Sequence, residues 1–383
     1  MSTRGFSIVM FATILVLFAA CAPAAPVPTP TVMPKATVSP PPSKAEATPV
    51  AKTSPAPVAK EAAKPSALEQ LIEGARKDGA VRAALTGDLG EKGAQRLADA
   101  FNKKYGLNLK VDITLVSSMR EATSKMVMEL KTGAEPSWDV IHAFVGALAP
   151  MVDDGVLAKY DWVGTFPYIS PKAVLLDGAL LFINSTVKAP AYNFNLVRPG
   201  DLPRRWEDFH DPKWTGNLVH HDTGGVWAEF VEVWGEERTT AFVEGIARQN
   251  PVFARAYQVV PQIASGEYSM TPHIMGSAIL KAMEKGAPVR AVEGIAPLPT
   301  STFMLAIPKT AKYPNAAKLF TGFQLTLEAQ QIWWDEDKTG SPFVAGPMAE
   351  WVKGKDVFWK SLDFELKRWP SLQQKYDKIL GLK

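Results

Sequence analysis

Residues 80–115 read AVRAALTGDLGEKGAQRLADAFNKKYGLNLKVDITL, and their side-chain pattern predicts a strand, a helix and a second strand. The short apolar run Ala80–Leu85 is typical of a buried strand, and Thr86–Gly90 has the composition of a loop. Apolar residues then recur with helical spacing as far as Tyr105, and Leu107–Leu115 alternates apolar with polar residues. A unit of this kind favours two parallel strands with the helix packed against the sheet.

The same alternation continues on both sides of this unit. Ser66 is placed to cap a helix that ends at Gly79, just before the first strand. After the second strand we expect a helix capped by Ser117 and Ser118, a strand over Trp138–Phe144 and a helix over Gly146–Val152. Strand and helix therefore alternate about every 30 residues, which predicts a parallel sheet with helices on both faces.

The pattern changes after Tyr160. Two strands, Lys172–Ile183 and Thr186–Phe194, follow each other without a long helix between them, and Ile295–Ile307 is expected to be a strand pair or one long bent strand. Other elements expected in this half are a short helix 201–209, a strand 216–221 with a helix through Trp234, a helix 236–249, a helix 258–265, a strand 268–271, a helix 274–285, a helix 314–335 and helices within 350–382. The sequence thus predicts two α/β lobes, with changes of character near residues 160–195 and 285–310.

The chain begins with a predicted signal peptide. Arg4 precedes the unbroken apolar run Phe6–Ala20, which at about 15 residues is shorter than the roughly 20 that span a bilayer. The ending LFAAC resembles a bacterial lipobox, with Phe18 where leucine is usual, and it predicts a lipidated Cys21 and a protein anchored on the outer face of the cytoplasmic membrane or in the periplasm. The alternative is ordinary cleavage after residues 22–24, which would release a soluble exported protein.

Residues 22–65 are rich in proline, alanine, threonine, valine and lysine and contain no aromatic residue. Such a segment cannot build a core, so we expect a disordered, semi-extended tether. Residues 1–65 carry a net charge of +4 and the remainder about −1, without a basic stripe, which argues against nucleic acid as a partner. The single cysteine excludes an internal disulfide.

Five segments along the chain carry a family resemblance. They are ADAFNKKYG (98–106), LAPMVDDGVLAKY (148–160), YNFNLV (192–197), LPRRWEDFHDPKWTG (202–216) and PNAAKLFTGFQLTLEAQ (314–330). In their order and spacing they resemble the extracellular solute-binding proteins of ABC importers. More narrowly, they are similar to the group that contains the ferric-ion, thiamine, polyamine and 2-aminoethylphosphonate receptors.

The resemblance implies an α/β type 2 periplasmic-binding-protein fold, with two lobes of mixed sheets joined by crossover strands and closing by hinge bending. Lobe 1 would comprise about 66–165 and 290–330, and lobe 2 about 175–285 plus the C-terminal helices of a body spanning 66–383. The implied protein is a monomeric receptor rather than an enzyme. It uses no cofactor and delivers a small solute to ABC permease subunits.

Ligands in open α/β sheets bind outside the carboxyl ends of strands, where helix N-termini attract anions. Three loops in such positions have small residues with free backbone donors: Thr86–Gly90, Ser117–Ser118 and Thr223–Gly225. Ordinary helix capping is the simpler explanation for each loop taken alone. Our full set of candidate ligand-binding residues is Thr86, Gly87, Asp88, Ser117, Ser118, His142, Phe144, Tyr192, His221, Thr223, Gly224, Trp227 and His273.

Metal binding is a weaker prediction. By resemblance, ferric receptors use a pair of adjacent tyrosines that would fall near Met275 and Gly276, where this sequence has none. We therefore predict no metal site. His142, His221 and His273 nevertheless leave open the alternative of an exported metal receptor or a metal-dependent hydrolase.

The predicted solute is a small polar molecule, first an organic carboxylate or phosphonate, because the loop-to-helix junctions favour anions. A cationic or ring-bearing solute is the second hypothesis, and it would need acidic partners such as Asp88 and Asp222. An enzyme is disfavoured because the chain lacks HExxH, GxSxG, P-loop and GxGxxG motifs. A structural surface protein on a proline-rich stalk would have no use for a two-lobed cleft.

Overall fold

The computed structural model describes residues 65–382. The predicted signal peptide, Cys21 and nearly all of the predicted tether lie outside these residues. Within the described part, none of the helices combines the length and the apolar character needed to cross a bilayer.

The predicted strand–helix–strand unit is confirmed. Strand β1 (Ala80–Thr86) lies between β2 (Lys110–Val116) and β3 (Val140–Phe144), and both pairings are parallel. The helices that follow these strands are α2 (Gly90–Tyr105), α3 (Met119–Thr132) and α4 (Val145–Asp153). Helix α1 (Ala67–Asp78) begins at a capping box formed by Ser66 and Glu69 and ends at Gly79, whose φ of 74° is in the left-handed region.

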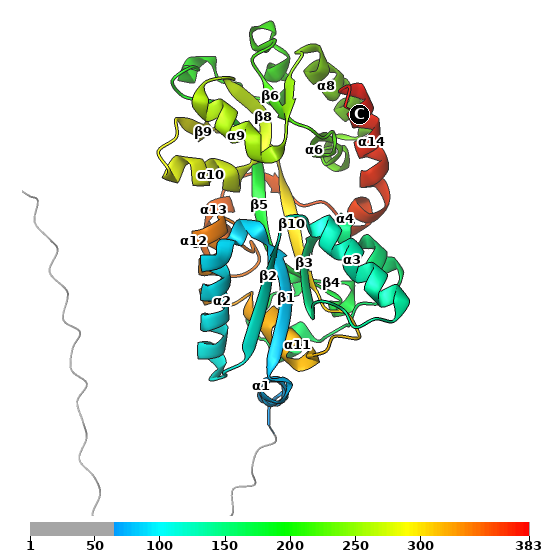
Figure 1. The fold of residues 1–383 in the computed structure, drawn as a ribbon. Helices are drawn as coiled ribbons and strands as arrows, with labels where there is room; N and C mark the ends of the chain where they lie inside the picture. The colour runs from blue at the N-terminus through cyan, green and yellow to red at the C-terminus, as the bar shows by residue number, and fades with distance from the viewer. Residues whose placement is uncertain (1–64, 383) are drawn as a thin grey trace, which may run out of the picture. The chain divides into compact units, whose positions relative to one another are not determined.

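Two long strands connect the two ends of the molecule, as Figure 1 shows. They are β5 (Leu180–Asn193) and β10 (Leu298–Ala306), and they extend the parallel strands into one mixed sheet with the order β2-β1-β3-β10-β5-β4. Strand β10 is antiparallel to both β3 and β5. Strand β4 (Val174–Leu175) is antiparallel to β5 at the edge of the sheet, and the short helix α5 (Trp162–Thr165) precedes it in the chain.

The predicted break between two strands at residues 184–185 was wrong, because β5 runs through these positions as a single strand of 14 residues. Asn184, Ser185 and Thr186 interrupt the apolar pattern, yet all three are buried. Ser185 donates to the carbonyl of Ser301 at 2.5 Å, and Thr186 accepts the backbone N–H of Ser277 at 3.0 Å. The neighbouring strand and helix satisfy these polar groups, so the strand continues through them.

The second lobe is built on the far end of β5. Strands β8 (Met270–Met275) and β9 (Val289–Ala291) pair with β5, while β6 (Val219–His221) and β7 (Val252–Ala254) form a separate parallel pair. Its helices are α6 (Gly225–Ala228), α7 (Val231–Trp234), α8 (Glu236–Arg248), α9 (Ala256–Ser265) and α10 (Gly276–Glu284). The strand predicted over 268–271 thus reaches Met275, and the helix predicted from Ile274 begins at Gly276.

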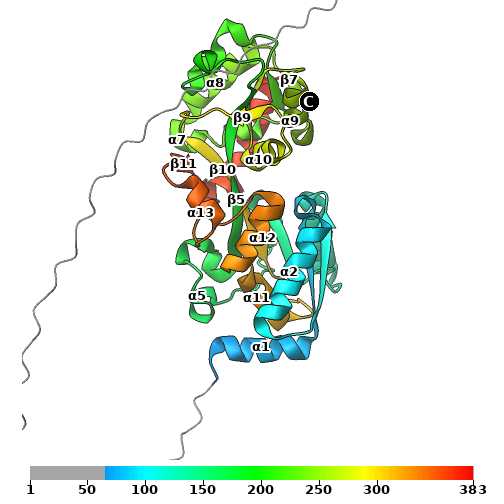
Figure 2. The same cartoon turned by 90° about the vertical axis from the view of Figure 1, so that its left-hand side faces the viewer.

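The C-terminal segment, residues 314–379, packs against both lobes. Helices α11 (Pro314–Phe323) and α12 (Leu327–Asp337) replace the single helix predicted there, and Thr326 caps the second. The chain continues through α13 (Pro347–Val352), β11 (Val357–Phe358), which pairs with β10, and a π-helical turn, Phe364–Arg368. It ends in α14 (Trp369–Ile379), which packs on α6 of the second lobe; Figure 2 shows α11 and α12 at the first lobe.

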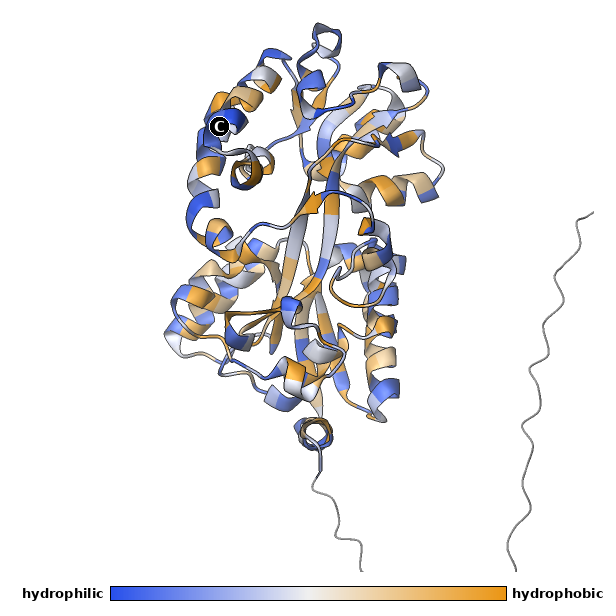
Figure 3. Cartoon of the chain, turned by 180° about the vertical axis from the view of Figure 1, so that it is seen from behind, coloured by the Kyte–Doolittle hydropathy of each residue, from blue (hydrophilic) through white to orange (hydrophobic). Residues whose placement is uncertain are grey.

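Each lobe has its own core. Figure 3 shows apolar residues along the sheet and along the inner faces of the helices. In the first lobe Phe101 contacts Phe320 and Phe323 edge to face, with ring centroids 5.3 and 5.6 Å apart. In the second lobe Trp206 and Trp227 are almost fully buried, within a cluster that also includes residues of α14. A further buried cluster in the second lobe includes Val259, Ile263 and Ile274, and β5 and β10 run between the two lobes.

Candidate functional site

A cavity of about 310 Å³ lies between the two lobes. The first lobe contributes Arg120, Phe144 and Gly146, and the crossover strands contribute Lys188 and Ser301–Phe303. The remaining lining residues come from the second lobe and the C-terminal segment: His221, Thr223, Gly225, Val226, Glu229, Ala256, His273, Ile274, Met275, Lys360, Glu365, Trp369 and Gln373. This volume is at the lower end of the range for small-molecule sites, about 300–1,000 Å³.

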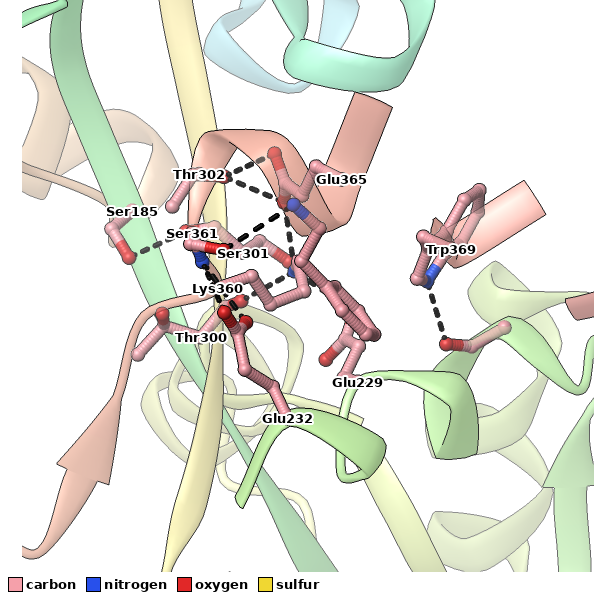
Figure 4. Close-up of polar contacts among 12 residues, drawn as sticks. Ser185, Glu229, Glu232, Thr300, Ser301, Thr302, Lys360, Ser361, Glu365 and Trp369 are labelled. Carbon is pink, nitrogen blue, oxygen red and sulfur yellow. Dashed lines mark hydrogen bonds and ion pairs between the residues drawn. The ribbon is translucent and has the colours of Figure 1, made fainter. Parts of the chain in front are cut away.

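Four buried charges form one network in the cavity wall. Glu229 Oε1 accepts from Lys188 Nζ and from Lys360 Nζ, the latter at 3.2 Å. Lys360 Nζ also lies 3.0 Å from Glu365 Oε1 and 3.2 Å from the carbonyl oxygen of Thr300 (Figure 4). Thr302 donates to Glu365 Oε1 at 3.1 Å. The network thus contains two cations and two anions, and it joins β5, the second lobe, β10 and the C-terminal segment.

The two lysines differ in their electrostatic surroundings. Burial lowers the pKa of Lys188, and the nearby charge of Lys360 adds to this effect against the attraction of Glu229. Burial also opposes the charge of Lys360, but the carboxylates of Glu229 and Glu365 together raise its pKa. We infer that Lys360, which contacts both carboxylates, is protonated near pH 7 and is the central cation of the network.

Arg120 is the cavity's remaining cation. It lies in the first turn of α3, its guanidinium carbon is 5.3 Å from the centroid of the Phe144 ring, and it is exposed. Among the described residues no carboxylate lies within ion-pair distance of Arg120. A cation held over an aromatic ring and facing a cavity is a suitable partner for an anionic group.

Two buried polar atoms of the cavity wall have no hydrogen-bond partner among the described residues. They are Glu229 Oε2 and His273 Nε2. Glu229 is 3% exposed and His273 is 1% exposed, so bulk water does not supply the missing hydrogen bonds either. Burial lowers the pKa of His273 well below its ordinary value, and Lys188 is the next largest cause, so His273 is neutral near pH 7.

Four of the residues predicted from the sequence line the cavity: Phe144, His221, Thr223 and His273. Thr223 Oγ1 accepts from the backbone N–H of Gly225 and from Gln373 Nε2, both at 3.1 Å. His221 Nε2 lies 3.5 Å from Asp222 Oδ1, and burial lowers the pKa of His221. The predicted loop 223–225 thus contributes to the cavity, but together with the C-terminal helix.

The other predicted residues do not line this cavity. Thr86 Oγ1 accepts from the backbone N–H of Asp88, and the carbonyl of Asp88 accepts from Lys281, while Gly87 begins a 3-10 turn. Ser118 caps α3, and Ser117 precedes it. The remaining ones are His142, buried beside Asn184; Tyr192, in a separate pocket with Val187 and Trp351; Gly224, whose N–H donates to Asp377; and Trp227, fully buried in the second-lobe core.

The histidines do not converge on a metal. His142 Nε2 lies 3.0 Å from Asn184 Oδ1, and its ring contacts Trp333 in the first lobe, whereas His221 and His273 belong to the cavity. No cluster of three or more His, Cys, Asp or Glu side chains suited to a metal ion occurs among residues 65–382. Asp88 and Asp222, the acidic residues proposed for a cationic solute, do not line the cavity.

Sequence reasoning missed all the charged residues that line the cavity: Arg120, Lys188, Glu229, Lys360 and Glu365. Lys188 and Glu229 interrupt apolar stretches, VKAPAY and VWAEFVEV, and a charge inside such a stretch is a usable signal for a buried polar group. Lys360, Glu365, Trp369 and Gln373 lie in the C-terminal segment, which carries no motif. These residues line the cavity because the C-terminal segment passes beside it, and the sequence of the segment does not indicate this path.

The comparisons with known proteins agree with this architecture. The family model described as bacterial extracellular solute-binding protein matches residues 96–353. Curated proteins gave no significant match. Many solved structures share the fold.

Three of these structures are described with different ligands. Iron-bound HitA from Pseudomonas aeruginosa has 20% sequence identity and a TM-score of 0.61 and covers 79% of this chain and 99% of its own. AfuA from Actinobacillus pleuropneumoniae with fructose-6-phosphate has 18% identity, a TM-score of 0.60 and coverages of 79% and 98%. AgtB from Agrobacterium tumefaciens with agropinic acid has 17% identity, a TM-score of 0.57 and coverages of 79% and 99%. At these identities the likeness concerns the fold.

A mixed α/β fold of two lobes with a charged cavity between them is suited to holding a small solute, and the family match spans about two thirds of the chain. The family comprises solute-binding transport proteins rather than enzymes. The chain belongs to the bacterial extracellular solute-binding proteins of ABC transporters.

Proposed function

We propose that this protein captures a small organic anion in the interlobe cavity and delivers it to an ABC permease. The observation that carries the proposal is the position of Arg120, which faces the cavity without a carboxylate partner among the described residues. Lys188 and Lys360 are neutralised by Glu229 and Glu365, so the charge available to a solute is that of Arg120. A carboxylate or phosphonate would complete this balance.

The cavity walls support a solute that has a carbon body as well as a charge. Phe144, Val226, Ile274, Met275 and Phe303 contribute apolar surface to the lining. A small, largely apolar pocket with a few polar groups is typical of metabolite sites. The solute would therefore place its anionic group at Arg120 and its carbon skeleton along these side chains.

Two other solutes fit the cavity less well. A polyamine or another cation would need free carboxylates, and the two that line the cavity already bind lysines. Ferric iron prefers hard oxygen ligands such as phenolate and carboxylate, and no tyrosine of the described residues lines the cavity. HitA is described as iron-bound, but its likeness to this chain is one of fold.

The direct test is native mass spectrometry of the full-length protein, purified without refolding, with metal analysis of the same sample. We expect a bound organic anion of metabolite mass that leaves on denaturation. Stoichiometric metal, or a bound polyamine, would contradict the proposal. If the protein is recovered empty, a thermal-shift screen of organic anions and cations decides between them, because only anions should raise the melting temperature.

We further propose that lipidated Cys21 anchors the protein and that residues 22–65 hold its monomeric two-lobed body clear of the membrane. Two or more acyl chains on one cysteine give stable anchoring, at about 0.8 kcal/mol for each buried CH₂ group. The C21A variant should move from the membrane fraction to the soluble exported fraction. Equal partitioning of the wild-type and C21A proteins would contradict the anchor.

A further inference from the structure

Only one of the two carboxylate oxygens of Glu229 has hydrogen-bond partners among the described residues. Its Oε1 accepts from two lysines, whereas Oε2 is buried in the cavity wall without a hydrogen-bond partner among residues 65–382. A buried acceptor in this state destabilises the structure, because it has lost water without gaining a hydrogen bond, and the free-energy cost is larger when the acceptor is charged. A solute group that donates a hydrogen bond to Oε2 would recover this free energy on binding.

The surroundings of Glu229 favour a neutral donor over an ammonium group. Lys188 and Lys360 already contact the same carboxylate, so an ammonium at Oε2 would be the third cation around one anion. The other carboxylate of the cavity cannot compensate, because Glu365 is occupied by Lys360 and Thr302. A hydroxyl group donates to Oε2 without adding charge.

His273, on the same cavity wall, independently calls for a hydrogen-bonding group on the solute. Its Nε2 is buried and unpartnered among the described residues, and the ring is neutral near pH 7. The ring nitrogens of a neutral imidazole are one donor and one acceptor, and a hydroxyl group can match either of them. An ammonium group could only donate, and a carboxylate could only accept.

We infer that the solute is a hydroxylated organic anion, with its acidic group at Arg120 and hydroxyl groups at Glu229 Oε2 and His273 Nε2. This inference rests on the proposed function and narrows it. Glu229 and His273 would be the specificity-determining residues, selecting hydroxy acids or phosphorylated polyols over plain or amino-substituted acids of the same length.

The test is a thermal-shift screen of the full-length protein against three matched sets of carboxylates and phosphates with three to six carbons: hydroxylated, unsubstituted and amino-substituted. For the six-carbon carboxylates the matched probes are gluconate, hexanoate and 6-aminohexanoate. We expect the stabilising compounds to fall in the hydroxylated set. Preferential stabilisation by an unsubstituted or amino-substituted acid would overturn the inference and leave the anion site in place. Stabilisation by none of the anions would overturn both proposals.

Calorimetry with the best hydroxylated compound then assigns the residues. E229Q replaces a charged acceptor by a neutral amide, and we expect at least a tenfold loss of affinity. The matched control is E232Q, because Glu232 is exposed, accepts from the backbone N–H of Ser361 and does not line the cavity. If E229Q does not fold, H273F serves as the second variant. It should weaken the hydroxylated compound about tenfold and leave its deoxy analogue unchanged, whereas equal losses for both compounds would overturn the role of His273.

Discussion

Lys360 Nζ lies 3.2 Å from Oε1 of Glu229, a residue that precedes it by 131 positions in the chain. The contact connects the C-terminal segment to the wall of the cavity in the second lobe. Through Thr300 and Glu365 the same ammonium also contacts β10 and the π-helical turn (Figure 4). The C-terminal segment is therefore part of the cavity wall.

The first prediction concerns this contact. K360M removes one cation from a buried network of four charges and leaves Glu365 without its ionic partner. Breaking a buried pair typically costs about 3–5 kcal/mol, so we expect a loss of this order in the free energy of unfolding measured with urea. The control is K353M, since Lys353 is 75% exposed and should contribute less than about 0.5 kcal/mol. Equal stabilities of the two variants would contradict a structural role for the network.

A second prediction tests the anion site. R120Q should weaken binding of the solute identified by mass spectrometry at least tenfold, because the charge of Arg120 is the one available in the cavity. R120K should retain part of the affinity, and R248Q, which changes an exposed arginine of α8, should retain all of it. Calorimetry at two salt concentrations checks the mechanism: the wild-type affinity should fall with added salt, and that of R120Q should fall less.

A third prediction concerns the residues that the sequence and the structure both assign to the cavity. H221A and T223A should each lower solute affinity about tenfold or more, since both side chains line the cavity. T223A also removes the acceptor of Gln373 Nε2 and so loosens the C-terminal helix at the cavity. The control is T215A, a change in the same lobe outside the lining, where Thr215 pairs with Gln249. Unchanged affinity in both H221A and T223A would place the solute elsewhere.

Buried histidines, among them His142, His220 and His273, make the stability of the protein depend on pH. Burial lowers the pKa of His142 and that of His220 to about 4. The unfolded chain, with histidine pKa values near 6.5, therefore binds protons that the folded chain does not, and acid favours unfolding. Stability should fall as the pH decreases from about 6.5 to about 4, by on the order of 3 kcal/mol for each histidine when the loss is complete.

Urea denaturation at pH 7.5, 5.5 and 4.5 measures this loss. In H142F the difference between pH 7.5 and 4.5 should shrink by the share of one histidine. A difference identical to that of the wild-type protein would show that His142 is not buried in the neutral form.

Much of the fold could be predicted because local patterns and architecture agree. The run from Ala80 to Leu115 gave the right strand–helix–strand order, and Ser66 and Gly79 marked both ends of α1. The single strand β5 could not be predicted, because the polar residues Asn184–Thr186 have hydrogen-bond partners that are distant in sequence. Local patterns do not contain such partners.

The site was predictable to a smaller extent. His221 and Thr223 were found because the first ends β6 and the second follows it, where the fold places its ligands. His273 was found because the predicted strand ended at Thr271, although the residue lies inside β8. Trp227 and His142 were misleading, because a polar ring inside an apolar stretch has the same pattern whether it faces a core or a cavity. Lys360 and Glu365 depend on the path of the C-terminal segment across the cleft, which no local signal in residues 338–368 encodes.

The last prediction separates packing from binding at Gly224. The sequence predicts Gly224 to be a ligand-binding residue, but a Cβ atom there would lie 2.5 Å from the backbone nitrogen of Asp377 and 2.6 Å from the carbonyl carbon of Tyr376. These are backbone atoms of α14 and cannot give way without moving the helix, so G224A should destabilise the protein by about 1–3 kcal/mol.

Because α14 carries Trp369 and Gln373 to the cavity, its displacement in G224A should also weaken solute binding. The control is G200A, where a Cβ atom would meet nothing within 4 Å and where neither stability nor affinity should change. Urea denaturation and calorimetry on both variants separate the effects. If G224A lost affinity at full stability, Gly224 would contact the solute directly; a parallel loss of both would mean that the glycine serves the binding site by holding α14 against α6.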